Sequence, residues 1–145
     1  MIPSEFQIYI DGASEGNPGP AGIGVILTQN GQVIRNISVY LGIQTNNVAE
    51  YMALIFGLQE ALMLKAKAVS IYTDSQLLSR QINNEYKLRS PNLIGLYAQV
   101  VHLLSAFDSA KVQYIPREEN RGADKLAKKA AQKKLFTQAK VATLR

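Results

Sequence analysis

The spacing of hydrophobic residues changes at Asn46, and this change constrains the fold more than any other feature of the chain. From there to residue 65 the apolar side chains recur every three or four residues, which predicts a helix. Before it, alternating apolar and polar residues predict three strands, at residues 5–11, 22–28 and 33–41. The dipeptide Asn30-Gly31 between the last two strands is typical of a tight hairpin. The first third of the chain therefore predicts an antiparallel unit followed by a helix.

Strand and helix patterns alternate in the remainder of the chain. The predicted elements are a strand at 69–73, a helix from an Asp74-Ser75 cap to about 84, a helix at 91–107, a strand at 111–115 and a helix at 120–135. The main connections are a glycine- and proline-rich loop at 12–20 and a polar loop at 84–90, and residues 137–145 form a short strand or a loose tail. The order βββαβααβα predicts an α/β fold, in which parallel strands extend three antiparallel ones into a five-stranded mixed sheet flanked by helices.

The composition limits the classes of protein that remain. A chain of 145 residues with 47% hydrophobic residues can bury one core, so we expect a single domain over residues 1–145. The absence of cysteine excludes disulfides, thiolate metal sites and cysteine nucleophiles. No signal-peptide pattern and no apolar run of membrane length is present, so we expect a soluble cytoplasmic protein without a membrane partner.

The net charge of +5 suggests a polyanionic partner, and all of the excess lies at the end of the chain. Residues 1–116 carry seven basic and eight acidic side chains, whereas 117–145 carry nine basic and three acidic ones. The surplus includes the lysines of the last predicted helix, which are Lys125, Lys128, Lys129, Lys133 and Lys134. These lysines form either a solvated helix face or a surface that meets the partner.

Two aspartates follow strands that are candidates for parallel neighbours. Asp11 ends the first predicted strand, and Asp74 ends the fourth. Ligands of open α/β sheets gather at the carboxyl ends of parallel strands, and neighbouring strands lie about 4.8 Å apart, so the two carboxylates would converge. The alternative is that each aspartate only caps a turn or a helix.

Glu50 and Asp124 are two further candidates for the same site. Glu50 is the sole charged residue between 46 and 59, and it shares a helix stripe with Leu54, Gly57 and Ala61, which should pack against the sheet. A buried carboxylate requires partners, although a half-exposed residue near the helix dipole is the alternative. Asp124 lies near the start of the last helix, where a dipole-stabilising role is equally open.

Four converging carboxylates would repel one another by about 3 kcal/mol per pair at an effective dielectric constant of about 20, so they would need cations. Oxygen ligands select hard ions such as Mg²⁺ or Mn²⁺, and two such ions suit phosphodiester hydrolysis. Other chemistries lack their residues: His102 is the sole histidine, and no Gly-x-Ser-x-Gly elbow or phosphate-binding glycine pattern is present.

Five motifs, in order along nearly the whole chain, resemble type 1 ribonuclease H. They are Ile8-Tyr9-Ile10-Asp11-Gly12, Gly16-Asn17-Pro18-Gly19-Pro20-Ala21-Gly22-Ile23-Gly24, Thr45-Asn46-Asn47-Val48-Ala49-Glu50, Tyr72-Thr73-Asp74-Ser75-Gln76, and Pro116-Arg117-Glu118-Glu119-Asn120 leading to Asp124. The resemblance implies a ribonuclease H-like fold and cleavage of the RNA strand of RNA/DNA hybrids with two Mg²⁺ ions, with Mn²⁺ as a possible substitute. It is greatest to compact archaeal-like and some bacterial variants.

The resemblance also implies roles for individual residues. The catalytic and metal-binding carboxylates would be Asp11, Glu50, Asp74 and Asp124. Contacts along the minor groove of the hybrid would come from Gly12, Asn17, Asn46, Asn47 and Gln76, with a 2′-hydroxyl contact for Glu50. Thr45 and Asn92 would hold a phosphate of the DNA strand. Such contacts position a duplex without reading its sequence.

Three departures from the family concern how substrate is held and released. The loop 115–123 lacks the histidine that many relatives carry, which leaves that role vacant or assigns it to Arg117, Glu118 or Glu119. The loop 84–90 replaces a long basic handle, and the chain has no tryptophan. Ile43 stands where an arginine often joins the phosphate pocket. Weaker hybrid affinity, or affinity supplied elsewhere, would follow.

The sequence thus predicts a sequence-nonspecific endoribonuclease, acting as a monomer on RNA/DNA hybrid. Two alternatives stay open at this point. One is a broader specificity that includes double-stranded RNA, which the short handle permits. The other is a non-catalytic hybrid-binding module, which the repulsion within an intact set of four acids disfavours.

Overall fold

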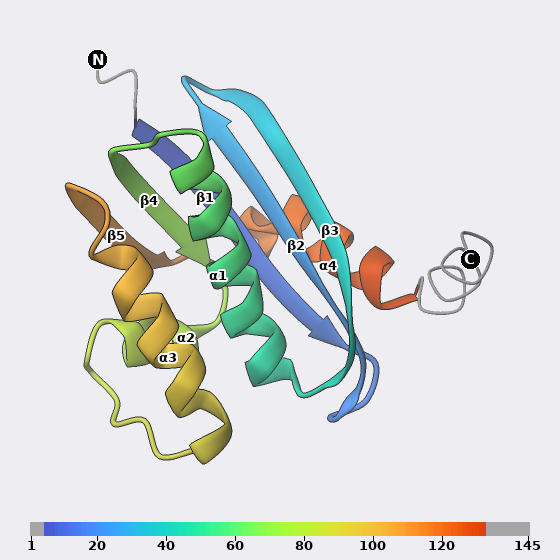
Figure 1. The fold of residues 1–145 in the computed structure, drawn as a ribbon. Helices are drawn as coiled ribbons and strands as arrows, with labels where there is room; N and C mark the ends of the chain where they lie inside the picture. Colours follow the sequence, from blue (N-terminus) through green and yellow to red (C-terminus); the bar gives the residue numbers. More distant parts are fainter. Residues whose placement is uncertain (1–4, 133–145) are drawn as a thin grey trace, which may run out of the picture.

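The computed structural model describes residues 5–132 and contains one five-stranded sheet with helices on both faces (Figure 1). The sheet order is β3-β2-β1-β4-β5, which confirms the predicted fold class. The elements are β1 (Glu5–Ser14), β2 (Gly19–Gln29), β3 (Gln32–Gln44), α1 (Asn46–Met63), β4 (Ala68–Thr73), α2 (Gln76–Ile82), α3 (Pro91–Leu104), β5 (Ser109–Tyr114), the 3-10 turn η1 (Arg117–Glu119) and α4 (Arg121–Gln132). Residues 133–135 of the last predicted helix, and the predicted strand or tail at 137–145, lie outside the described residues.

The strand directions place β1 at the centre of the sheet. β1 pairs with β2 in antiparallel orientation and with β4 in parallel orientation, and β5 continues the parallel side. The hairpin between β2 and β3 turns through Asn30 and Gly31, whose φ angles of 54° and 78° suit a two-residue turn that matches the twist of the strands. The carboxyl ends of β1 and β4 therefore reach the same edge.

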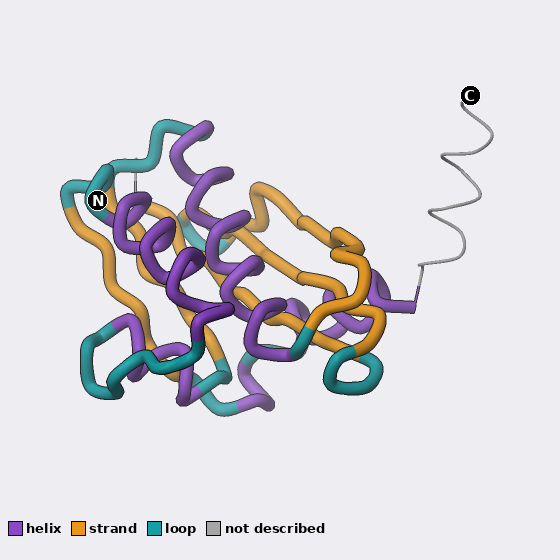
Figure 2. The backbone as a smooth tube through the Cα atoms, turned by 60° about the horizontal axis from the view of Figure 1, so that its bottom comes forward, coloured by secondary structure: helices purple, strands orange, loops and turns teal. Residues whose placement is uncertain are grey.

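Helices α1, α2 and α3 lie on one face of the sheet, and α4 lies on the other (Figures 1 and 2). The α1 side contains the large apolar core, including Ile8 and Ile10 of β1 and Leu54 and Leu58 of α1, all fully buried. The α4 side is built from small residues. A Cβ on Gly24 of β2 would collide with the backbone of α4, so the two elements approach closely and hold α4 in place.

Several predicted boundaries differ from the structure. The loop expected at 12–20 is wrong at both ends: β1 continues to Ser14 and β2 begins at Gly19, because residues 12–14 pair with residues 21–23, which overrides the weak strand preference of glycine. β3 likewise extends to Gln44, beyond the expected residue 41, and β5 begins at Ser109, before the expected residue 111. The helix expected to reach residue 107 ends at Leu104, and Phe107 is buried after it. The turn η1 was not expected.

Candidate active site

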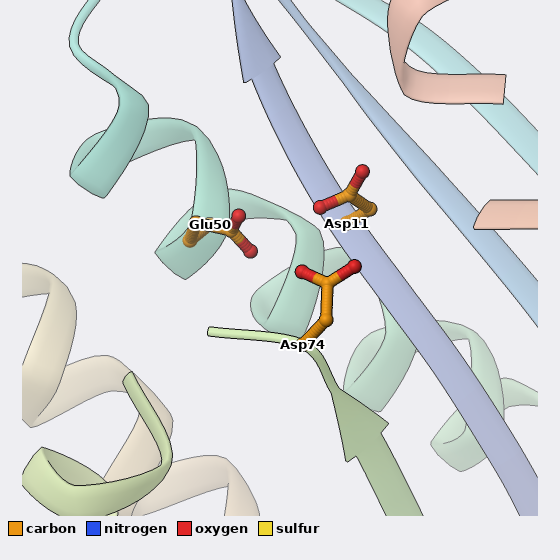
Figure 3. Close-up of side chains that lie close together, drawn as sticks. All are labelled: Asp11, Glu50 and Asp74. Carbon is orange, nitrogen blue, oxygen red and sulfur yellow. The ribbon is translucent and has the colours of Figure 1, made fainter. Parts of the chain in front are cut away.

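The register between β1 and β4 brings two of the predicted carboxylates together. Ile10 is paired with Thr73, so Asp11, still within β1, and Asp74, directly after β4, lie at the same level of adjacent strands; the expectation that Asp11 ends its strand is wrong, because β1 continues to Ser14. Ser75 caps α2 by accepting a hydrogen bond from the Leu78 N–H (3.1 Å), so the Asp74 side chain is free to face Asp11. One oxygen each of Asp11, Glu50 and Asp74 lies within 4.8 Å of the others (Figure 3).

Glu50 reaches this pair because α1 approaches β1 very closely. A Cβ on Gly12 would overlap the backbone of Ala49 and Glu50, so glycine is required at this position. The Gly12 backbone acts to lower the pKa of Glu50, against the effects of burial and neighbouring charge that raise it. The Oε2 oxygen of Glu50 is buried and has no hydrogen-bond partner among residues 5–132. Glu50 is therefore half-buried as a residue, and its Oε2 is shielded from solvent without a donor among residues 5–132.

Asn120 supports the site and was not singled out from the sequence. It is 2% exposed, and its Nδ2 donates to the Ile10 carbonyl (2.9 Å) and to Asp74 Oδ2 (3.3 Å). The residue therefore ties the start of α4 to β1 and orients Asp74. Nothing local in the sequence indicates this role, because its partners lie far away along the chain.

Asp124 lies beside the cluster but is held differently. It lines the same open cavity, of about 490 Å³, as the other three carboxylates. It is absent from the group whose oxygens all lie within 4.8 Å, and its Oδ2 instead accepts an ion pair from Lys128 Nζ at 3.1 Å. The expected convergence of four carboxylates is thus a cluster of three with the fourth at its rim.

Burial and mutual repulsion give these carboxyls unusual affinities for protons. Desolvation, followed by the charge of Asp74, raises the pKa of Asp11 to about 8. Desolvation and the charges of Asp11 and Asp74 raise the pKa of Glu50. Desolvation also raises the pKa of Asp74, against the opposing effects of Asn120 and Arg117.

The Asp124 carboxyl shows the opposite behaviour. Desolvation acts to raise its pKa, but a hydrogen bond shared with Asp11 and the interaction with Lys128 outweigh it, so the pKa of Asp124 lies below its usual range. The site therefore combines three carboxyls that resist ionisation with one that stays charged.

This donor set fits divalent cations of the hard class. The cluster offers only carboxylate oxygens, and the unpartnered Glu50 Oε2 is an orphaned acceptor that a cation would satisfy. Cations would also offset the repulsion that raises the three pKa values. Asp11, Glu50 and Asp74 are accordingly the residues that could hold a metal, with Asp124 within reach; their roles in metal binding and catalysis stay predictions.

The predicted substrate-binding residues fall into two neighbouring regions. Gly12 and Asn46 line the carboxylate cavity. Asn17 joins them, because its Oδ1 accepts a hydrogen bond from the Asn46 N–H at 3.0 Å. Asn47 is exposed beside Asn46 at the start of α1, and Gln76 is exposed at the start of α2, two residues after Asp74.

A second groove contains the residues expected to hold a DNA phosphate. Thr45 and Asn92 line it together with Ile43, which is 61% exposed. Thr45 Oγ1 caps α1 by accepting from the Val48 N–H (3.2 Å), which leaves its hydroxyl proton available to a ligand. The groove walls are otherwise mostly apolar, so Ile43 adds contact area but no charge.

Two basic residues within residues 5–132 line the carboxylate cavity, Arg117 of the loop and Lys128 of the last helix. Arg117, a candidate for the role of the missing histidine, lines the cavity with Asp74 and Asp124. Glu118 lines an adjoining pocket together with Arg117 and Asp124, and the charge of Glu119 raises the pKa of Tyr9, so of the three candidates Arg117 alone lines the carboxylate cavity. Lys128 is the second cation at the cavity.

The short loop after α2 is folded onto itself. Arg80 donates a hydrogen bond to the Tyr86 hydroxyl and lies over its ring, 5.1 Å from the centroid. The Tyr97 hydroxyl of α3 donates to Asn84 at 2.8 Å. Tyr86 is 46% exposed, and it is the aromatic side chain that this compact loop presents in place of a tryptophan.

A mixed sheet with acids on β1, directly after β4 and on α1 defines a ribonuclease H-like fold, and comparisons with known proteins agree. A family model described as "Reverse transcriptase-like" matches residues 9–130. Ribonuclease HI of Halobacterium salinarum is 37% identical over 123 residues, which are 84% of this chain and 62% of that protein. Its crystal structure superimposes with a TM-score of 0.86, covering 88% of this chain and 98% of that one.

Two other relatives show the same fold. LC11-RNase H1, isolated from compost and solved in complex with RNA/DNA hybrid, is 40% identical, with a TM-score of 0.85 and coverage of 90% and 99% of the two chains. A bifunctional protein of Mycobacterium tuberculosis is 39% identical over 125 residues, 85% of this chain. The chain belongs to the ribonuclease H family, as a type 1 domain, and this family is metal-dependent.

The chain corresponds to only part of the length of some relatives. The chain spans about a third (34%) of the length of the mycobacterial proteins it matches. None of the helices within residues 5–132 is long and apolar enough to cross a membrane.

Proposed function

We propose that the chain is an endoribonuclease that hydrolyses the RNA strand of RNA/DNA hybrids without sequence preference. The observation that carries this proposal is the cluster of Asp11, Glu50 and Asp74 within 4.8 Å, with an unpartnered Glu50 oxygen, in a ribonuclease H fold. Relatives named ribonuclease H, and one solved with RNA/DNA hybrid, support the substrate. The finer expectations of one domain over 1–145, a monomer and a cytoplasmic location are proposed with it.

The residues of the site divide the work of such a reaction. Asp11, Glu50, Asp74 and Asp124 would hold two Mg²⁺ ions, with Mn²⁺ as a substitute; when bound, these supply a nucleophilic water at neutral pH and offset the charge of the leaving oxygen. Asn120 fixes the orientation of Asp74 through its 3.3 Å hydrogen bond. Arg117 places a positive charge at the cavity, where the scissile phosphate would lie.

Hybrid recognition would rest on polar groups beside the carboxylates. The polar groups of Gly12, Asn17, Asn46, Asn47 and Gln76 suit hydrogen bonds to sugars, including the 2′-hydroxyls that distinguish RNA. Thr45 and Asn92, in the second groove, suit a phosphate of the DNA strand. Contacts to sugars and phosphates position a duplex but carry little base information, so we expect cleavage without sequence preference.

A substrate panel tests the proposal. Labelled RNA/DNA hybrid, RNA duplex and DNA duplex are incubated with the full chain in Mg²⁺, in Mn²⁺ and with chelator. We expect cutting of the RNA strand of the hybrid in metal alone, and its loss in Asp74→Asn. A folded protein that cuts no hybrid in either metal would overturn the proposal. Cutting of RNA duplex as well would establish the broader specificity that the short loop after α2 permits.

A further inference from the structure

The lysine-rich helix α4 does not present all of its charge to the site. Of its three lysines within the described residues, Lys125, Lys128 and Lys129, all are exposed, but Lys128 alone lines the carboxylate cavity. Lys128 also lines the adjoining pocket with Arg117 and Arg121. The charge surplus of the C-terminal segment therefore reaches the site through one residue of this helix.

Lys128 is paired with Asp124, the carboxylate at the rim of the cluster. Its Nζ lies 3.1 Å from Asp124 Oδ2, and the two residues are one helical turn apart on α4. Residues spaced by four on a helix are neighbours, so the two side chains stay within reach of each other as long as α4 is folded. The ammonium thus occupies an oxygen of Asp124 that is otherwise available to a ligand in the cavity.

The pair is well placed to open. The Lys128 side chain is 55% exposed and that of Asp124 is 19% exposed, so solvent screens their attraction. Exposed ion pairs of this kind contribute little to stability, and a lysine side chain has a flexible four-carbon stem. Lys128 can therefore leave Asp124 without disturbing the helix, whose buried face is made of alanines such as Ala123 and Ala127.

We propose that Lys128 is a built-in counter-ion of Asp124 that competes with a divalent cation for this carboxylate, and so sets the metal concentration that the enzyme requires. The inference rests on the proposed function, because it takes the carboxylate cavity as the metal site. Lys128 acts through Asp124 and is a positioning residue. Its positive charge disfavours a cation in the cavity twice, by occupying an Asp124 oxygen and by direct repulsion.

The expected size of the effect follows from the strength of such pairs. An exposed ion pair contributes about 0.2–1 kcal/mol, so removing Lys128 from Asp124 should tighten binding of the divalent cation by about 1.4- to 5-fold. The loss of direct repulsion between Lys128 and the cation adds to this. We expect Lys128→Gln to bind Mn²⁺ at least about threefold more tightly than the unaltered chain. Lys128→Arg, which keeps the charge and the spacing, should stay near the unaltered value.

The test is a Mn²⁺ titration of the full chain, with free Mn²⁺ measured by electron paramagnetic resonance and no substrate present. Lys129→Gln is the matched control, because it removes the same charge from the next residue of the helix. Tighter binding in Lys128→Gln, but not in Lys128→Arg or Lys129→Gln, supports the inference.

The other outcomes overturn it in distinguishable ways. Equal affinities in Lys128→Gln and the unaltered chain show that Lys128 does not compete with the metal. Equal tightening in Lys128→Gln and Lys129→Gln shows that net charge, and not the Asp124 pair, is responsible. In both cases the unaltered chain still binds Mn²⁺ and the proposed function stands, whereas an unaltered chain that binds no Mn²⁺ overturns both.

Discussion

Replacing Asp11 by asparagine should stabilise the protein in the absence of metal, although it removes a residue of the proposed site. Asp11 is 4% exposed and lies against Asp74 and Glu50, and its pKa rises from 3.8 to about 8 on folding. Between these two values the folded chain holds a proton that the unfolded chain has released. Since the folded state binds more protons there, the stability of the unaltered protein falls as the pH rises from about 4 to about 8.

The magnitude follows from the distance between the two pKa values. Each pH unit above the pKa of Asp11 in the unfolded chain lowers the free energy of unfolding by about 1.36 kcal/mol. At about pH 7 the unaltered protein is therefore less stable by about 4 kcal/mol than under acidic conditions. Asparagine has the same shape and no charge, and Asp11→Asn is free of this cost. We therefore expect the variant to be more stable by about 3–4 kcal/mol at about pH 7, with a gain that shrinks towards zero near pH 4.

Urea unfolding followed by circular dichroism, with chelator and at several pH values, measures this difference. Asp108→Asn is a matched control, because Asp108 is exposed and lies outside the cluster. Addition of Mg²⁺ should narrow the gap by stabilising the unaltered protein, since a ligand that binds only the folded state adds to stability. A variant less stable than the unaltered protein at about pH 7, or a gap independent of pH, would refute the reasoning.

Three other substitutions separate the roles of neighbouring residues. Glu50→Gln should lower the rate of hybrid cleavage by at least about 100-fold, more than the loss typical of a residue that only supports the metal ligands. Its stability in urea should be unchanged or higher, and a stable variant that cleaves hybrid at a near-normal rate contradicts the role of Glu50. Asn120→Ala should cost about 2 kcal/mol in urea unfolding, because the Ile10 carbonyl loses a buried donor, and a cost near zero would show that the bond contributes nothing. Gly24→Ala should lower the thermal midpoint through an overpacking cost of about 1–3 kcal/mol, whereas Gly95→Ala, in open space on α3, should raise it; equal effects would contradict close packing of α4 on β2.

The sequence determines the order of elements because each has a strong local pattern. The switch from alternation to helical spacing at Asn46 coincides with the start of α1, and Asn30-Gly31 forms the expected hairpin. Local patterns fail where pairing between strands decides the end of an element. Residues 12–14 extend β1 only because they pair with β2.

The same distinction applies to the site. Asp11 and Asp74 could be paired from the sequence because strand direction and register fix both, and Glu50 was conspicuous as a lone charge on an apolar stripe. Asn120 could not be found in this way, since its bond to Ile10 joins residues 110 positions apart. The division of the acids into a cluster of three and Asp124 paired with Lys128 depends on side-chain geometry that no spacing rule supplies.

The central position of β1 makes the proposed site depend on segments that lie far apart in the chain. Its antiparallel partner follows within a few residues, but its parallel partner β4 begins only at Ala68, and the contact through Asn120 comes still later. A ribosome-bound chain that lacks α4 has neither Asp124 nor the bond that orients Asp74. Assembly of the proposed site is therefore coupled to docking of the last described helix, and a metal bound by all four acids would report that β1, β4 and α4 have come together.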